Sequence, residues 1–243
     1  NSYDIEIGSN LLKEGTITKL FNFKEVMLIY DQNLDSSYVN KVLPLLKSSG
    51  ATINVELSLE ATEKNKSYKS LNKIHDLLIE NKFSRDCLLI GLGGGIICDL
   101  VGFAAATYQR GVDFILVPTS LLAQVDASVG GKTAINSNQG KNLIGTFYQP
   151  DAVLIDISIL NSLPRREMIC GYGEILKHSL ILDRNFFLWL SKNAKKIINN
   201  KNKKLLKLAI IKSCKIKSKI VCRDEREKNI RMILNFGHTF AHG

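Results

Sequence analysis

Two segments near the end of the chain carry residue types that could hold a metal ion. In RMILNFGHTFAHG, His238 and His242 are four residues apart, which would place both imidazoles on one face of a helix. Two histidines at this spacing can bind one metal ion. In GYGEILKH, Glu174, Lys177 and His178 likewise share a helical face. The spacing alone leaves metal binding and ordinary packing as equal alternatives.

A cluster of glycines in the first half of the chain could bind phosphate. The apolar run at residues 87–90 is typical of a buried parallel strand, and GLGGG at residues 91–95 ends it. A helical run follows at residues 96–106, with Asp99 one turn inside. Glycines between a strand and a helix let the backbone approach a phosphate at the positive end of the helix dipole. The alternative is a tight turn with no ligand.

A second apolar run, residues 114–117, ends at Pro118 and leads into a segment rich in glycine and small residues. Thr119 and Ser120 can cap the helix that follows the proline. We interpret the later part of the segment as an ordered surface loop, where chemistry is commonly placed on a rigid scaffold. The residues in it that could do chemistry are Asp126, Lys132, Lys141 and Asn142.

The elements that must position these residues alternate between strand and helix as far as residue 157. Strands are predicted at residues 3–7, 25–30, 51–57, 87–90 and 114–117. From Pro164 onward only helical runs follow, at residues 166–181, 185–198, 203–222 and 229–243. The alternation predicts an α/β fold with a parallel sheet covered on both faces. We place a Rossmann-like α/β domain at residues 1–160 and an all-helical, incomplete domain at 161–243.

Composition limits the classes of function. The 243 residues are 45% hydrophobic and 23% charged, which is ordinary for a soluble globular protein. No apolar run approaches the roughly 20 residues that a membrane-spanning helix needs, and no signal peptide is visible. The five cysteines include no C-x-x-C pair. We therefore expect reduced thiols, a cytoplasmic location and no membrane partner.

The net charge of +10 has a local origin. Eleven lysines and no acidic residue lie between Lys192 and Lys219. Such a block could mark a nucleic-acid surface, a solvated helix face or an anionic substrate site. No aromatic residue interleaves the lysines and no nucleic-acid-binding motif accompanies them, so we predict that the protein does not bind nucleic acid.

Three gap-free blocks resemble the signature segments of the 3-dehydroquinate synthase family: GGGIICDLVGFAAATYQRG, VPTSLLAQVDASVGGKTAIN and GKNLIGTFYQP. The resemblance extends from about Asp31 to the last residue. It implies a carbon–oxygen lyase of the shikimate pathway that needs NAD and a divalent metal, Zn²⁺ or Co²⁺. The implied reaction converts 3-deoxy-D-arabino-heptulosonate 7-phosphate to 3-dehydroquinate and phosphate. Its steps are transient oxidation of the substrate by NAD, phosphate elimination, reduction and intramolecular aldol closure.

The same resemblance assigns roles to individual residues. The residues implied to hold NAD, or to bridge it to the substrate, are Asp31, Asn33, Glu63, Lys66, Gly94, Gly95, Asp99, Thr119, Ser120, Lys132, Lys141 and Ser162. Those implied at the substrate are Asp126, Lys177 and Asn235 at the reacting hydroxyls, Lys217 and Arg231 at the carboxylate, and Lys132, Asn142 and His242 at the phosphate. Arg110 is expected to reach the phosphate from the second subunit of a homodimer. Glu174 and His238 are the implied metal ligands, whereas His178 is expected to be structural.

The sequence also departs from the family. The third metal ligand of the family, a histidine in a His-Gly-Glu segment, would lie after Gly243. We therefore expect a C-terminally truncated copy. Thr62 stands where glycine is usual. Another sugar phosphate cyclase, a polyol dehydrogenase related to glycerol dehydrogenase, and an inactive NAD-binding fragment remain as alternatives. Asn235 and His242 favour the dehydroquinate branch, and the VDASVGGKTA block disfavours the dehydrogenase.

Overall fold

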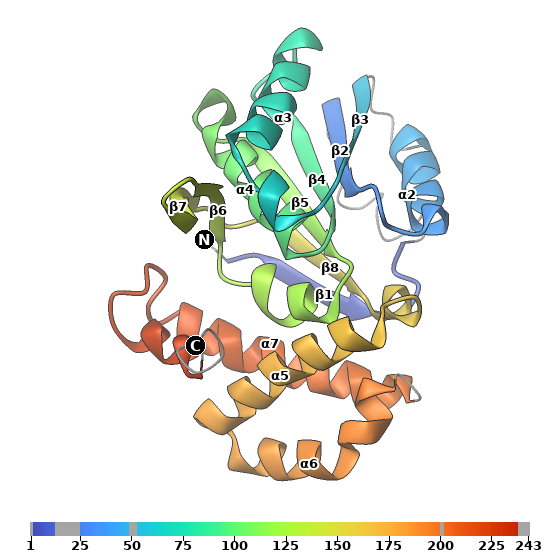
Figure 1. Cartoon of the computed structure of the whole chain (residues 1–243). Coiled ribbons are helices and arrows are strands. Elements are labelled where there is room, and N and C mark those ends of the chain that lie inside the picture. The colour runs from blue at the N-terminus through green and yellow to red at the C-terminus, as the bar shows by residue number, and fades with distance from the viewer. Residues whose placement is uncertain (1, 13–24, 49–52, 200–201, 238–243) are drawn as a thin grey trace.

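The computed structural model describes residues 2–12, 25–48, 53–199 and 202–237 (Figure 1). His238 and His242 lie outside the described residues. The strands are β1 Asp4–Gly8, β2 Glu25–Asp31, β3 Ile53–Leu59, β4 Leu88–Gly93, β5 Asp113–Pro118, β6 Lys132–Ser137, β7 Gly140–Phe147 and β8 Ala152–Asp156. The α-helices are α2 Ser36–Ser48, α3 Tyr68–Glu80, α4 Gly95–Thr107, α5 Arg165–Leu182, α6 Arg184–Ile198 and α7 Lys203–Val221.

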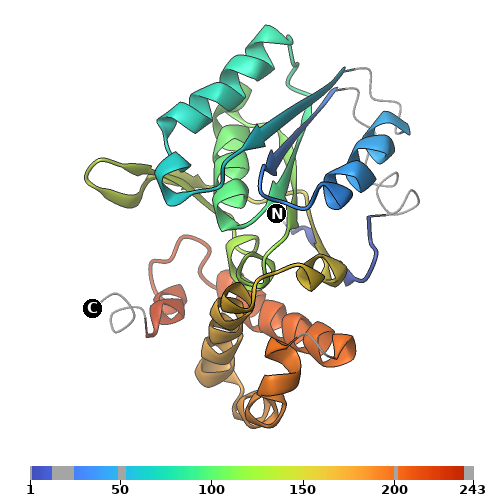
Figure 2. The same cartoon turned by 45° about the vertical axis from the view of Figure 1, so that its right-hand side comes forward.

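The upper layer of the molecule is a parallel sheet with helices on both faces (Figures 1 and 2). Six strands run in the order β1-β8-β5-β4-β2-β3, and all of their pairings are parallel. Alternate residues of β2 face opposite sides. Val26 and Leu28 pack with α2, while Met27 and Ile29 share the larger core with α3 and α4. The predicted α/β fold with a covered parallel sheet is confirmed.

The lower layer is helical (Figures 1 and 2). Helices α5, α6 and α7 contact one another, and buried apolar residues on each of them join the core of the sheet layer. Side-chain caps begin two of these helices: Asp183 accepts from the Phe186 N–H at 2.8 Å, and Asn202 accepts from the Leu205 N–H at 3.1 Å. None of the helices among the described residues is long and apolar enough to cross a membrane.

The glycine-rich segment expected to be a loop is a β-hairpin, so that prediction was wrong. Strands β6 and β7 pair antiparallel from Lys132↔Phe147 to Ser137↔Gly140. A Cβ atom on Gly145 would lie 2.0 Å from the Thr133 carbonyl oxygen, so glycine is required for close pairing and does not mark a loop. The hairpin packs directly on α4, where a Cβ atom on Gly102 would lie 2.4 Å from Thr133 Cγ2.

The last predicted α-helix is also wrong over its described part. Residues Ile230–Asn235 form a 3₁₀ helix, η5, and Phe236 then takes an extended conformation with φ −53° and ψ 129°. Gly237 follows at φ +83°, in the left-handed region that glycine tolerates. These two residues end the helix, so Asn235 does not begin a continuous α-helical face.

Candidate active site

A cavity of about 1000 Å³ lies at the carboxyl ends of the sheet strands. We call it the strand-end cavity. In parallel α/β sheets this edge is the usual ligand position. The predicted cofactor residues that line it are Asp31, Asn33, Glu63, Lys66, Gly94, Gly95, Asp99, Thr119, Ser120 and Ser162. Lys132 and Lys141 do not line it, although both were predicted at the cofactor.

The glycine turn between β4 and α4 forms one wall of this cavity. Gly94 is the N-cap of α4, and among the described residues no side-chain hydrogen bond caps the first helical turn. A Cβ atom at Gly94 would meet only Ser120 Oγ, at 3.8 Å. The backbone is therefore open to the cavity at the positive end of the helix dipole, which suits a diphosphate group.

Lys66 links the strand-end cavity to the hairpin. Lys66 is 5% exposed. Its ammonium group forms an ion pair with Asp99 and donates to Asn142 Oδ1 at 2.5 Å. Burial raises the pKa of Asp99 to about 6, although Lys66 opposes the rise. Asp99 lines a second cavity as well, so one carboxylate stands in the wall between the two spaces.

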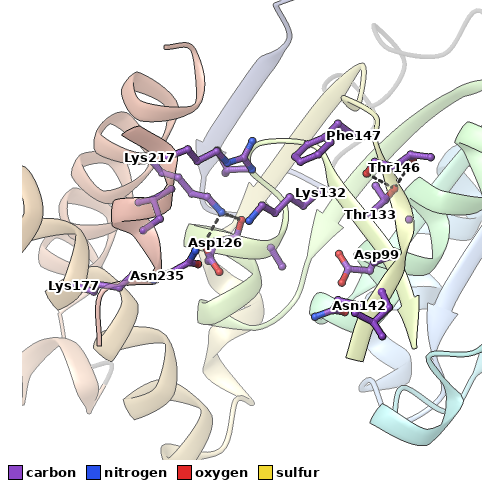
Figure 3. A pocket seen from close by; sticks show the side chains of 17 residues that line it. Asp99, Asp126, Lys132, Thr133, Asn142, Thr146, Phe147, Lys177, Lys217 and Asn235 are labelled. Carbon is purple, nitrogen blue, oxygen red and sulfur yellow. Dashed lines mark hydrogen bonds and ion pairs between the residues drawn. The ribbon is translucent and has the colours of Figure 1, made fainter. Parts of the chain in front are cut away.

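The second cavity, of about 530 Å³, lies between the hairpin and the helical layer (Figure 3). We call it the cationic cavity. Lys177 and Lys217 extend from the helical layer, while Asp99 and Asn142 stand on the opposite side (Figure 3). The predicted substrate residues that line it are Asp126, Lys132, Asn142, Lys177, Lys217, Arg231 and Asn235. The fold thus brings together residues from strands, helices and turns that are far apart in sequence.

Two buried lysines of the cationic cavity are paired with carboxylates. Lys217 forms an ion pair with Asp126 and also donates to its backbone oxygen at 2.6 Å, while Lys177 forms an ion pair with Glu174. Asp126 lies on a π-helical turn, η3 Ala123–Ala127, a geometry often found at functional sites. Burial raises the pKa of the Asp126 carboxyl, but Lys217 more than offsets this and holds the pKa below its usual range.

Lys132 is the most accessible of these cations. Its side chain is 49% exposed and forms an ion pair with Glu227, a residue that the sequence patterns do not point to. Burial, together with the nearby charges of Arg231 and Lys217, lowers the pKa of Lys132 to about 8. The only signal for Glu227 in the sequence is an acidic residue four positions before Arg231, which is too common a pattern to identify a site.

Arg231 is held rigidly at the edge of the cationic cavity. The residue is 1% exposed, and its Nη2 donates to the Gly130 carbonyl oxygen at 2.8 Å. Its guanidinium carbon lies 5.7 Å from the ring centroid of Phe147, a cation–π arrangement with the hairpin. Arg231 therefore offers a pre-oriented positive charge to an anion in the cavity.

Three potential metal donors meet beside the Lys177–Glu174 pair. Ligand atoms of Asp126, Glu174 and His178 lie within 4.8 Å of one another. His178 is fully buried; its Nδ1 lies 2.6 Å from Ser213 Oγ, and its Nε2 has no hydrogen-bond partner among the described residues. Burial lowers the pKa of His178 to about 4, so its imidazole is neutral and can act as a ligand. The predicted ligand His238 is outside the described residues.

Two further predicted residues stand apart from both cavities. Arg110 is exposed at φ 69°, and it is absent from the described lining of either cavity. Lys141 lies near the tip of the hairpin, where its Nζ is 3.8 Å from a carboxylate oxygen of Glu63. Their predicted roles, like those of all the site residues named from the sequence, stay predictions.

The family profiles and the curated relatives identify one family. The profile of the 3-dehydroquinate synthase N-terminal domain matches residues 56–170, and that of the C-terminal domain matches residues 171–243. The 3-dehydroquinate synthase of Pelagibacter ubique (strain HTCC1062) is 49% identical over 245 residues, which cover 99% of this chain and 65% of that protein. The chain thus spans about two thirds of the length of the curated relatives it matches.

Solved structures show the same fold. A 2-epi-5-epi-valiolone synthase from Streptomyces hygroscopicus subsp. jinggangensis 5008 superposes with a TM-score of 0.90 at 24% identity, covering 99% of this chain and 67% of that one. A 2-deoxy-scyllo-inosose synthase complexed with carbaglucose-6-phosphate, NAD⁺ and Co²⁺ superposes with a TM-score of 0.84 at 25% identity, covering 99% and 66%. The family profiles and the curated relatives together show that the chain belongs to the 3-dehydroquinate synthase family.

Proposed function

We propose that this protein acts as a 3-dehydroquinate synthase that uses NAD and a divalent metal, Zn²⁺ or Co²⁺. The proposed reaction converts 3-deoxy-D-arabino-heptulosonate 7-phosphate to 3-dehydroquinate and phosphate. The observation that carries the proposal is the wall shared by the two cavities. Asp99 lines both, so a dinucleotide on the glycine turn and an anion among the lysines would meet at this residue.

The strand-end cavity fits a dinucleotide. The uncapped start of α4 and the open space above Gly94 suit its diphosphate. Asp31 and Asn33 stand at the end of β2, the position from which an acidic residue commonly contacts a ribose hydroxyl. The occupied relative 2-deoxy-scyllo-inosose synthase, complexed with NAD⁺, supports the same ligand here.

The donor set beside Lys177 fits a divalent metal. Carboxylate oxygens and a neutral imidazole nitrogen are ligands that both Zn²⁺ and Co²⁺ accept. Glu174 would be a ligand, and His178, whose Nε2 has no hydrogen-bond partner among the described residues, belongs to the same group of donors. The ammonium groups of Lys177 and Lys217 now balance the two carboxylates there.

The cationic cavity fits a substrate with two anionic groups. When bound, NAD would accept a hydride from the substrate C5 hydroxyl carbon and return it later, and the metal would polarise that hydroxyl as a Lewis acid. Arg231 and Lys217 would bind the carboxylate, and Lys132 and Asn142 would bind the phosphate. Asp126 is held ionised by Lys217, so it can accept a hydrogen bond from a substrate hydroxyl.

We further propose a cytoplasmic homodimer in which Arg110 contacts the phosphate site of the partner subunit. Two observations support a role between subunits. First, Arg110 is exposed. Second, Gln109 and Arg110 are consecutive residues with positive φ, at 46° and 69° respectively. Strained backbone of this kind is retained only where the surrounding structure demands it.

The test is turnover by the protein expressed from its complete gene. We expect phosphate release from 3-deoxy-D-arabino-heptulosonate 7-phosphate without a net change in NADH absorbance, and 3-dehydroquinate as the product. Net NADH formation would instead identify a polyol dehydrogenase, and a different carbocycle would identify another cyclase. Loss of turnover on chelation, with recovery on adding Zn²⁺ or Co²⁺, tests the metal. The absence of any phosphate release would refute the proposed function.

A further inference from the structure

Glu227 places an internal anion on the most accessible cation of the cationic cavity. Its carboxylate forms an ion pair with Lys132, and its Oε1 also accepts from Asn235 Nδ2 at 2.9 Å. Lys132 and Asn235 both line the cavity, where a substrate would need them. The Glu227 side chain is only 15% exposed, so solvent screens this carboxylate less than a free surface acid.

The loop before η5 holds Glu227 in this position. Carboxylate oxygens of Asp224 accept from the backbone N–H groups of Lys228 at 2.9 Å, Asn229 at 2.6 Å and Arg231 at 3.1 Å. This set of bonds folds the loop tightly around Asp224, and Glu227 adopts φ 53° within it. A left-handed conformation is unfavourable for glutamate, so the fold imposes it rather than the local sequence.

The three lysine pairs of the cavity differ in how readily they could open. The Lys177 and Lys217 side chains are 9% and 7% exposed, whereas the Lys132 side chain is 49% exposed. Lys217 also keeps its bond to the Asp126 backbone oxygen. A pair whose lysine is half-exposed contributes less than one whose lysine is buried, so Lys132 is the lysine whose partner an incoming anion can most readily replace.

We propose that Glu227 is an internal counter-ion that competes with the substrate phosphate for Lys132 and that must release Lys132 and Asn235 when the substrate binds. The inference rests on the proposed function for the identity of the anion. Before binding, the counter-ion balances a lysine that stands near Lys177, Lys217 and Arg231, where an unpaired fourth cation would be repelled. After binding, the phosphate takes over this balance.

The experiment measures binding of inorganic phosphate by calorimetry, using the wild-type protein and Glu227→Gln. The glutamine keeps the shape and the Oε1 acceptor for Asn235 but removes the charge that holds Lys132. We expect Glu227→Gln to bind phosphate about fivefold more tightly, because a partly exposed ion pair of ordinary strength no longer has to open. Circular dichroism melting verifies that the fold is retained.

Two controls isolate the pair. Glu80→Gln makes the same change in net charge at an exposed end of α3 and should leave phosphate affinity unchanged. Lys132→Met should weaken phosphate binding, and adding Glu227→Gln to it should produce no gain, because the two residues act as a unit.

Unchanged or weaker phosphate binding by Glu227→Gln would overturn the inference, since Glu227 would then position Lys132 instead of competing for it. An equal gain in the Lys132→Met background, or no phosphate binding by any variant, would also overturn it. These outcomes are separate from the proposed function, which stands or falls on phosphate release from the sugar phosphate. If the wild-type protein turns over normally but Glu227→Gln shows no gain in phosphate affinity, only the counter-ion inference is refuted.

Discussion

Replacing Lys66 by methionine should show how much the Lys66–Asp99 ion pair between the two cavities contributes to the free energy of unfolding. Lys66 is 5% exposed and its ammonium pairs with Asp99, whose side chain is 19% exposed. Removing one partner of a fully buried ion pair commonly costs about 3–5 kcal/mol. Asp99 keeps some solvent and can take up a proton, so we expect a loss of about 2 kcal/mol at pH 8. That corresponds to roughly 4–8 °C in Tm for a chain of this size.

The loss should depend on pH in a defined direction. The pKa of Asp99 is raised from 3.8 to about 6, so the folded protein binds this proton more tightly than the unfolded chain does. The stabilisation from this group is therefore complete below about pH 4 and is lost as the pH rises through about 6. Lys66 lowers the Asp99 pKa, so its removal raises that pKa further and extends the loss to higher pH.

Urea denaturation at pH 5 and at pH 8 measures both effects. We expect Lys66→Met to differ little from wild type at pH 5 and to be clearly less stable at pH 8. Lys64→Met is the matched control, because Lys64 is an exposed lysine in the short 3₁₀ turn Glu63–Asn65 that immediately precedes Lys66. An equal loss of stability at both pH values would refute the electrostatic explanation and point to lost packing.

Three other substitutions test the cationic cavity, the metal donors and the packing of the hairpin on α4. Lys132→Ala should abolish phosphate release, with the fold intact by circular dichroism. The affinity of the wild-type protein for phosphate should fall as the pH rises through about 8, where Lys132 loses its proton. A calorimetric titration in which this fall has its midpoint near pH 10 would contradict the prediction. His178→Ala should lower Co²⁺ affinity at least tenfold in visible absorption titrations, and unchanged affinity would exclude it from the metal site. Gly102→Val should push the hairpin off α4 and cost about 1–3 kcal/mol in urea denaturation, because no space exists beside Thr133.

The predictable part of the fold came from short-range patterns. The run at residues 87–90 and the glycines after it mark β4 and the start of α4, because strand burial and turn chemistry are local properties. The hairpin was not predictable in the same way. Gly145 signals a loop by composition, whereas its actual role is to let Thr133 of the opposite strand approach, and that partner lies outside any local window.

The candidate site divides along the same line. Glu174 and the glycine turn were recognisable because their neighbours in sequence carry the pattern. Glu227 was not recognisable, because its significance comes entirely from Lys132, a residue on a different element. Similarly, His178 shares a helical face with Glu174, but only the folded chain supplies Ser213 and Asp126 around its ring.

The sequence by itself determined the α/β architecture, the glycine turn and the family, because hydrophobic periodicity and motif spacing are properties of residues that are close together in the chain. The tertiary structure alone decided that Asp99 lies between two cavities, that Lys66 is buried against it, and that the most accessible lysine of the cationic cavity is already paired with Glu227. The physical reason is that ion pairing, desolvation and the resulting pKa values depend on distances through space. Those distances are established only when strands, hairpin and helices pack together.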